Sequence, residues 1–174
     1  MYDNILLDRN ICIRGINLDD MQQIRESVTG SAVFTESEIH DVLNMIEHYV
    51  RFPEKDELET YAYTIGEKIA GFVSFGLGLG NRTYELYWIC VSSEYQGHGI
   101  GAKLLKFAEN HIIGCGGRIL FIETSTSDKY EKARAFYERR GYTVSAIVRD
   151  YFDEGDDKLI YSKKLLSPKP STCA

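Results

Sequence analysis

Glycine occupies alternate positions in the run Gln96-Gly97-His98-Gly99-Ile100-Gly101, which stands directly before an apolar helical pattern. Glycine has no Cβ, so such positions let the backbone approach a ligand closely and adopt dihedral angles that other residues resist. The pattern that follows predicts a helix over Gly99–Ile113, with Gly114 placed to end it. Because the free amides at a helix start attract anions, this run predicts a site for a phosphorylated cofactor.

The length of the chain, 174 residues, is that of one ordinary domain. We expect a single domain over residues 1–174, with a core of about residues 10–166 and terminal extensions at 1–9 and 167–174. No apolar stretch approaches the roughly 20 residues that span a bilayer. Ile5-Leu6-Leu7 is also too short for the apolar part of a signal peptide. The expected location is therefore the cytoplasm, with no membrane partner.

The charge balance and the cysteines exclude further classes. A net charge of -6 disfavours nucleic-acid binding, which needs a concentrated basic surface, and would favour a cationic substrate. The four cysteines have no metal-type CxxC spacing and are too few for a disulfide framework. We therefore expect reduced thiols and no metal.

Two hydrophobic periodicities alternate along the chain and indicate its fold class. Helical spacing follows two capping sequences, one at Asn17 and one at Thr35-Glu36-Ser37-Glu38. From Glu59 the period changes to two and predicts a hairpin with its turn at Gly66-Glu67-Lys68. The later expected elements are the strands Tyr84–Val91, Arg118–Glu123, Tyr142–Ile147 and Lys158–Leu165, and a helix over Tyr130–Arg140. The order predicts an α/β (α+β) fold, a mixed central sheet flanked by helices. Its first strands are antiparallel, and a parallel pair lies at the glycine helix.

Two other phosphate-binding motifs come close to the glycine run. A P-loop requires Gly-Lys-Ser/Thr, whereas this chain has Gly101-Ala102-Lys103-Leu104. A dinucleotide fingerprint fits better, since Gly97-x-Gly99-x-x-Ala102 has its spacing and Glu123 ends the next strand. However, Ser92–Gln96 separate the preceding strand from the first glycine, where that fingerprint has an immediate turn. A dinucleotide-binding oxidoreductase is kept as a third alternative.

The glycine run also resembles the signature of the GNAT acyltransferases, Gln/Arg-x-x-Gly-x-Gly/Ala after a strand. A second block typical of that family follows as Ala133-x-x-Phe136-Tyr137-x-x-x-Gly141-Tyr142. The resemblance covers about Tyr61–Leu165 well and the first sixty residues in outline. One position departs from it, because family members often have asparagine where Tyr130 stands.

This resemblance implies acetyl-CoA as the cosubstrate. Its pyrophosphate would lie on the backbone of a segment whose residues are Gln96, Gly97, His98, Gly99, Ile100, Gly101 and Ala102. The strand segment Ile89, Cys90 and Val91 would hold the pantetheine arm through the backbone of Ile89 and Val91, with an amide near Ile89 on the thioester carbonyl. The site would need no metal.

The resemblance implies amine acetylation by direct attack in a ternary complex. Tyr137 would protonate the departing thiolate. An ammonium with a pKa near ~10.4 must first lose a proton, and Glu85, at even separations from Ile89 and Val91, is the candidate base. A water chain is the alternative. The acceptor stays open among small amines, peptides and proteins, a homodimer is plausible, and the runner-up is a CoA-sensing module with weak or no catalysis.

Overall fold

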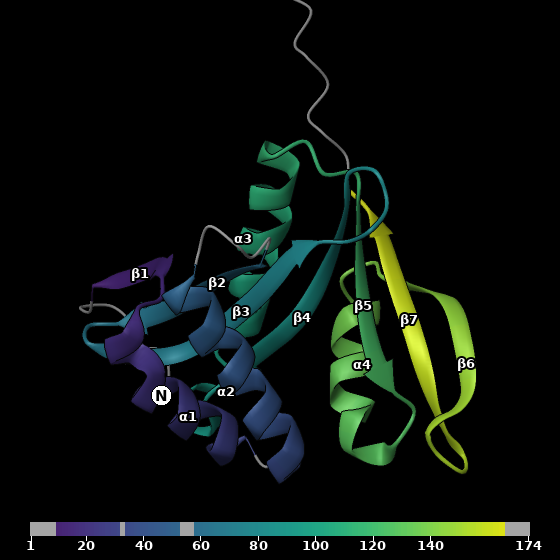
Figure 1. Ribbon diagram of the computed structural model, residues 1–174, viewed down its shortest axis with the longest axis horizontal. Helices are drawn as coiled ribbons and strands as arrows, with labels where there is room; N and C mark the ends of the chain where they lie inside the picture. The colour runs from purple at the N-terminus through teal and green to yellow at the C-terminus, as the bar shows by residue number, and fades with distance from the viewer. Residues whose placement is uncertain (1–9, 32–33, 53–57, 166–174) are drawn as a thin grey trace, which may run out of the picture. The chain divides into compact units, whose positions relative to one another are not determined.

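A computed structural model of the chain describes residues 10–31, 34–52 and 58–165 (Figure 1). The expectations for the two terminal extensions and for Cys173 lie outside these described residues. The helices and strands follow the predicted order. They are β1 (Ile11–Gly15), α1 (Met21–Gly30), α2 (Glu36–Arg51), β2 (Leu58–Ile65), β3 (Lys68–Leu77), β4 (Thr83–Val91), α3 (Ile100–Gly114), β5 (Ile119–Ser125), α4 (Glu131–Glu138), β6 (Thr143–Asp153) and β7 (Asp156–Lys164), with short 3-10 turns at Leu18–Asp20, Ser93–Tyr95 and Asp128–Tyr130.

The strands form a seven-stranded sheet in the order β1-β2-β3-β4-β5-β7-β6. β1 pairs antiparallel with β2, and β7 pairs antiparallel with both β5 and β6. β4 and β5 are parallel, with a register from Thr83↔Ile119 to Leu86↔Ile122. These pairings confirm the predicted mixed sheet, with its parallel strands on either side of the glycine helix in the sequence.

The contacts within the chain define two compact units. Unit 1 comprises the residues up to Phe75 together with Trp88–Lys106, and unit 2 comprises Gly76–Tyr87 together with the residues from Phe107 onward. β4 and α3 each contribute to both units. The expectation of a single domain stays a prediction.

Unit 1 has a core between two helices and the strands behind them. Both predicted caps are present, since Asn17 and Thr35 each form a capping box with the acidic residue three positions later. Asn17 caps the 3-10 turn that leads into α1, and Thr35 caps α2; both helices turn their apolar faces onto the sheet. The buried side chains that meet there are Ile24, Val28, Val42, Leu43, Ile46, Ala62, Ile69, Phe72 and Cys90.

A buried carboxylate fixes the entry of α1. Asp20 is 4% exposed and accepts hydrogen bonds from both terminal nitrogens of Arg14, at 2.7 and 2.8 Å, and from the backbone amide of Asn17 at 2.8 Å. The Arg14 guanidinium holds the pKa of the Asp20 carboxyl below its ordinary value. The ionised form of Asp20 is therefore part of the folded state.

Asp20→Asn is expected to lower the free energy of unfolding by about 1–3 kcal/mol at pH 7, because two charge-assisted hydrogen bonds are lost. The folded-state pKa lies below the unfolded one, so this stabilisation is complete above about pH 4 and disappears as the pH falls through the folded-state pKa. Urea unfolding of both proteins across this range should give converging stabilities. Asp19→Asn, at an exposed neighbour, is the control. A difference that persists at low pH would contradict the assignment.

Unit 2 is built around β5, which lies between β4 and β7 and carries the buried Leu120 and Ile122. α3 reaches this unit with Ala108 and Ile112, both fully buried. The backbone approaches most closely at Gly117, where a Cβ would lie 2.2 Å from Ile112 Cγ2. Only glycine fits at that position.

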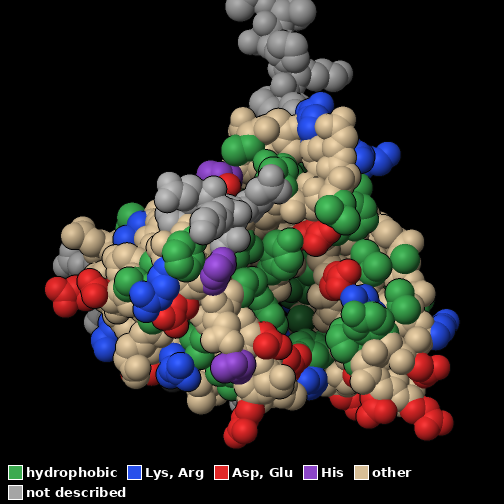
Figure 2. Space-filling model, in the orientation of Figure 1, with side chains coloured by type: hydrophobic (Ala, Val, Ile, Leu, Met, Phe, Trp, Pro, Cys, Tyr) green, Lys and Arg blue, Asp and Glu red, His purple; other side chains and the backbone are tan. Residues whose placement is uncertain are grey.

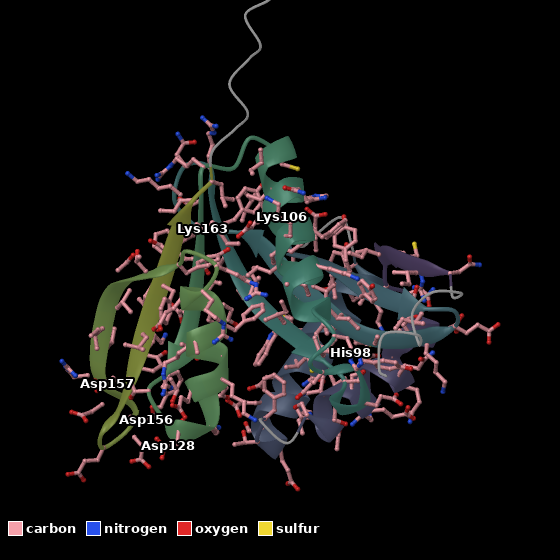
Figure 3. All side chains as sticks on the ribbon, turned by 180° about the vertical axis from the view of Figure 1, so that it is seen from behind. His98, Lys106, Asp128, Asp156, Asp157 and Lys163 are labelled. Carbon is pink, nitrogen blue, oxygen red and sulfur yellow. The ribbon has the colours of Figure 1, made fainter. Side chains whose placement is uncertain are left out.

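The acidic stretch Asp150–Asp157 lies between the strands expected at Tyr142–Ile147 and Lys158–Leu165, but in the structure both strands extend into it. β6 runs to Asp153 and β7 starts at Asp156, so that Glu154 and Gly155 alone form the turn, with Gly155 at φ +78°. Asp157 accepts hydrogen bonds from the Asp150 amide at 3.0 Å and from Arg149, which lower the pKa of its carboxyl. These hydrogen bonds hold the acidic stretch in a β-hairpin. Figure 2 shows acidic side chains gathered at its turn, and Figure 3 places Asp156 and Asp157 there.

Candidate functional site

The glycine run of unit 1 forms a turn ahead of α3. Gly97 and Gly99 have φ angles of +80° and +75°, a region that residues with a Cβ rarely adopt. Helix α3 begins at Ile100, one residue later than predicted, and the Gly99 carbonyl accepts its first bond from the Lys103 amide at 3.1 Å. The amides at the start of a helix have no acceptors within it. The turn therefore presents backbone donors of the kind that bind phosphate.

Two side chains of the run bond back onto the protein. Gln96 donates from Nε2 to the Val91 carbonyl at 3.1 Å, which ties the start of the turn to the end of β4. His98 Nδ1 lies 3.3 Å from the Tyr95 carbonyl and its ring is exposed; Figure 3 shows it in the turn before α3. Both contacts support the backbone of the turn.

The backbone direction of β4 follows from one hydrogen bond. The Ser92 amide donates to the Ala70 carbonyl of β3 at 3.0 Å. Neighbouring residues of a strand direct their backbone groups to opposite edges, so Ile89 and Val91 face away from β3. The parallel ladder with β5 ends at Leu86. Ile89 and Val91 thus lie beyond the last residue pair between β4 and β5. The Val91 carbonyl accepts the hydrogen bond from Gln96.

Gly71 is a residue that sequence reasoning missed. A Cβ there would lie 2.6 Å from the Cys90 carbonyl oxygen, 3.2 Å from Val91 Cα and 3.3 Å from Leu104 Cδ1. Its missing side chain therefore sets how closely β3 approaches both β4 and α3. The sequence carries only a weak signal for this, an isolated glycine inside an alternating strand.

Gly71→Ala is expected to lower the free energy of unfolding by about 1–3 kcal/mol, because the added methyl group meets backbone that must shift. The melting temperature should fall by several degrees, at roughly 2–4 °C per kcal/mol for a chain of this size. Gly15→Ala is the matched control, since a Cβ there meets nothing within 4 Å. Equal melting temperatures for the two variants would contradict the close packing at Gly71.

Cys90 lies on the same segment of β4 and is 4% exposed. Its thiol lies 3.6 Å from the Ser27 carbonyl oxygen, to which it donates. Burial raises the pKa of the Cys90 thiol to about 12, so the thiolate is scarce at neutral pH. These features fit a packing residue and argue against a nucleophile.

Tyr137 is the buried aromatic centre of unit 2. It is 7% exposed and lies in α4, with ring centroids at 5.4 Å from Phe136, 6.2 Å from Tyr142 and 6.1 Å from Tyr161. Burial raises the pKa of the Tyr137 phenol well above its usual range, which keeps it protonated. Its hydroxyl makes no hydrogen bond to any residue in the described ranges. Its proton is therefore not committed to another described residue.

The two tyrosines beside Tyr137 are fixed by carboxylates. Tyr142 donates to Glu109 Oε1 at 3.0 Å, and the same oxygen accepts from Lys163 Nζ at 2.7 Å. Tyr161 donates to Glu138 Oε1 at 2.7 Å, and burial raises its pKa to about 12. The hydroxyls of Tyr142 and Tyr161 thus have carboxylate partners, whereas the Tyr137 hydroxyl has none among the described residues.

Glu85 lines a cavity of about 430 Å³ in unit 2. The cavity lies over β4, β5 and β7, where Glu85 pairs with Phe121 and Glu123 pairs with Ile160. Glu123 forms an ion pair with Lys158 at 2.7 Å, whereas Glu85 has no hydrogen bond or ion pair with any described residue. The sequence indicates Glu123 only through the dinucleotide fingerprint, as the acid that ends the next strand. Strand parity would have placed it on the same face as Glu85.

Comparison with known proteins gives the same family as the two sequence motifs. The Acetyltransferase (GNAT) family matches residues 21–142. The chain belongs to the GNAT acetyltransferase family. A family member from Desulfovibrio desulfuricans has a solved structure that is 30% identical, with a TM-score of 0.84 over 90% of this chain and 99% of that one. The GNAT assignment replaces the dinucleotide-binding alternative, and the fold agrees with the one expected.

Further GNAT relatives differ in what their names record. An uncharacterised N-acetyltransferase of Methanocaldococcus jannaschii is 30% identical over 60% of this chain, and the match spans 65% of that relative's length. The S-(2-succino)cysteine N-acetyltransferase of Bacillus subtilis is 33% identical over 35% of this chain and 37% of its own length. The paia N-acetyltransferase of Thermoplasma acidophilum, solved with coenzyme A, has a TM-score of 0.67 at 20% identity, over 88% of this chain and 98% of its own. At that identity the likeness shows the fold alone.

The described residues contain neither a metal-binding cluster nor a membrane-spanning helix. Within them, no three His, Cys, Asp or Glu side chains gather where they could hold a metal ion. None of the helices described is both long and apolar enough to cross a bilayer.

Proposed function

We propose that this GNAT protein is an N-acetyltransferase that moves the acetyl group of acetyl-CoA to an amine. The observation that carries the proposal is the turn Gln96–Ala102, which combines left-handed glycines with the free amides of a helix start. It lies in a chain whose family is defined by acetyl transfer. Coenzyme A is bound in the solved structures of related fold from Thermoplasma acidophilum and from an aminoglycoside 6'-N-acetyltransferase.

The residues of unit 1 fit the cofactor. At Gly97 and Gly99 a Cβ would meet no atom within 4 Å, so the turn is open as well as left-handed. Its amides are suited to the pyrophosphate. Ile89 and the Val91 amide, on the β4 edge that faces away from β3, are the proposed partners of the pantetheine arm. A backbone donor aimed at the thioester oxygen would lower the barrier by about 3 kcal/mol.

The proposed reaction is a direct transfer. The amine nitrogen attacks the thioester carbonyl carbon, the C–N bond forms, and the C–S bond then breaks to leave a thiolate. The ammonium form of the amine first gives its proton to Glu85 or to water. Tyr137 gives a proton to the thiolate, and the extra proton that the acylated nitrogen releases restores the Tyr137 phenol. Neither the Tyr137 hydroxyl nor the Glu85 carboxylate has a hydrogen-bond or ionic partner among the described residues, which supports these roles. The cytoplasmic location and the homodimer stay predictions.

The names of the relatives span several acceptors. They include an amino acid derivative, ribosomal protein S18 and aminoglycosides. None of these acceptors transfers to this chain by name, because the matches are partial or below 25% identity. The acceptor class therefore depends on this chain's own residues.

A free-thiol release assay across an amine panel tests the function. With an acceptor, initial rates at varied acetyl-CoA and amine should give intersecting reciprocal lines, because both substrates bind before transfer. Parallel lines would indicate a covalent acetyl-enzyme instead. Binding of CoA without thiol release across the panel would favour the CoA-sensing module.

A further inference from the structure

The cavity beside Glu85 has two carboxylates, only one of which is ion-paired with a lysine, and this difference restricts the ligand. Of its two carboxylates, Glu123 is neutralised by Lys158, whose side chain is 13% exposed. The Lys158 ammonium also lies 3.7 Å from the centre of the Tyr151 ring, which fixes it further. Glu85 alone has no cationic partner among the described residues. The cavity therefore has one carboxylate available for one cation.

The rest of the wall is mainly apolar. Phe121, Tyr87 and Ile160 line the sheet side of the cavity, and Leu79 lines it from the β3–β4 turn. Leu79 is fully exposed, at 109% of its reference area, between Gly78 and Gly80. An isobutyl group held in water at the rim of a cavity is covered only when a ligand packs against it. The rim thus favours an apolar body on the ligand.

We propose that the acceptor is a small monocationic amine on an apolar alkyl or arylalkyl body. This inference rests on the proposed function, in which Glu85 receives the proton of the acceptor. The ammonium would lie at Glu85 and the apolar body between Phe121 and Leu79. The volume, about 430 Å³, lies within the range of small-ligand sites.

The same features select against polycations. A second ammonium would meet Glu123 already paired with Lys158 and walls that are mainly apolar, so it would lose hydration without gaining an unpaired carboxylate. Polyamines and aminoglycosides carry several such charges. The structure thus assigns selectivity to Glu85, the one carboxylate of this cavity without a partner in the described part of the chain, with the apolar rim supplying affinity.

Hexylamine and 1,6-diaminohexane test the proposal, because they differ by one terminal ammonium. The kcat/KM for hexylamine should exceed that for the diamine by roughly tenfold or more, since the second charge has no acceptor. Leu79→Ala should raise the KM for hexylamine by roughly tenfold and leave the KM for acetyl-CoA unchanged. Leu79→Glu adds a second carboxylate and should move the preference toward the diamine. Leu77→Ala is the matched control, because Leu77 is an exposed leucine that does not line the cavity.

Calorimetry with CoA-bound protein separates this proposal from the function on which it rests. If no amine is acetylated, the proposed function fails. The acceptor class would still be supported if hexylamine bound more tightly than the diamine and Leu79→Ala weakened that binding. The proposed acceptor class would be overturned if the wild type acetylated or bound the diamine as well as hexylamine, or better. A preference for S-(2-succino)cysteine or for an alanine-initiated peptide over hexylamine would also overturn it. Leu79 is fully exposed, so its variants should keep the wild-type melting temperature.

Discussion

Tyr137→Phe is expected to lower kcat by about 10²-fold, at the lower end of the contribution of a positioned general acid. The ring packing against Phe136, Tyr142 and Tyr161 is kept, so the melting temperature should change little. The KM for acetyl-CoA should stay near the wild-type value, because the hydroxyl acts on the leaving sulfur. Burial keeps the phenol protonated, since it raises the Tyr137 pKa. Steady-state rates with a saturating acceptor measure the effect.

Tyr161→Phe is the matched control for this variant. It removes a hydroxyl from the same aromatic cluster, but this hydroxyl already donates a hydrogen bond to Glu138. Its kcat should stay within a few-fold of the wild-type value, although it loses some stability through the lost hydrogen bond. Equal kcat values for Tyr137→Phe and the wild type, with an acceptor whose transfer step limits the rate, would refute the acid role.

The second large effect is expected at the phosphate turn. Gly99→Ala forces a residue with a Cβ to φ +75°, at a cost of about 1–2 kcal/mol. If the turn relaxes to avoid this strain, the amides at the start of α3 lose their alignment. We therefore expect the dissociation constant for CoA to rise by roughly 5–30-fold, the equivalent of about 1–2 kcal/mol. Calorimetric titration with CoA measures this directly.

Gly114→Ala is the control for the turn variant, because it adds the same methyl group at the other end of α3. Gly114 is helical, and a Cβ there meets nothing within 4 Å. Alanine is the better helix former by about 1 kcal/mol, so this variant should bind CoA as the wild type does. If both variants bind CoA equally, the backbone of the turn does not hold the phosphates.

Local signals predicted most of the elements. Asn17 and Thr35 form the caps that their spacing indicated, and the hairpin from β2 to β3 follows its period-two pattern. The sequence predicts no strand over Asp150–Asp157, because acidic residues disfavour strands by composition. The Asp150 backbone amide and the Arg149 guanidinium donate hydrogen bonds to the Asp157 carboxylate, and these bonds override that preference. They depend on the pairing of two strands, which no local pattern contains.

The candidate site also has some features that the local sequence indicates and others that depend on the folded chain. The glycine turn and the parity of Glu85 on β4 are local properties, so the sequence indicates both. The pairing of Glu123 with Lys158 depends on the register between β5 and β7, in which Ser125 lies opposite Lys158. The close approach at Gly71 likewise depends on the packing of α3 against β3. Which carboxylate of the cavity is available to a ligand therefore becomes visible only in the folded chain.

The central claim is that this protein transfers acetyl groups from acetyl-CoA to an amine. Incubation with isotope-labelled acetyl-CoA and hexylamine, followed by mass spectrometry of the amine and thiol titration, tests it most directly. We predict labelled N-acetylhexylamine, with one free thiol released for each amide formed. Thiol release without labelled amide, or bound CoA with neither product across the amine panel, would contradict the claim.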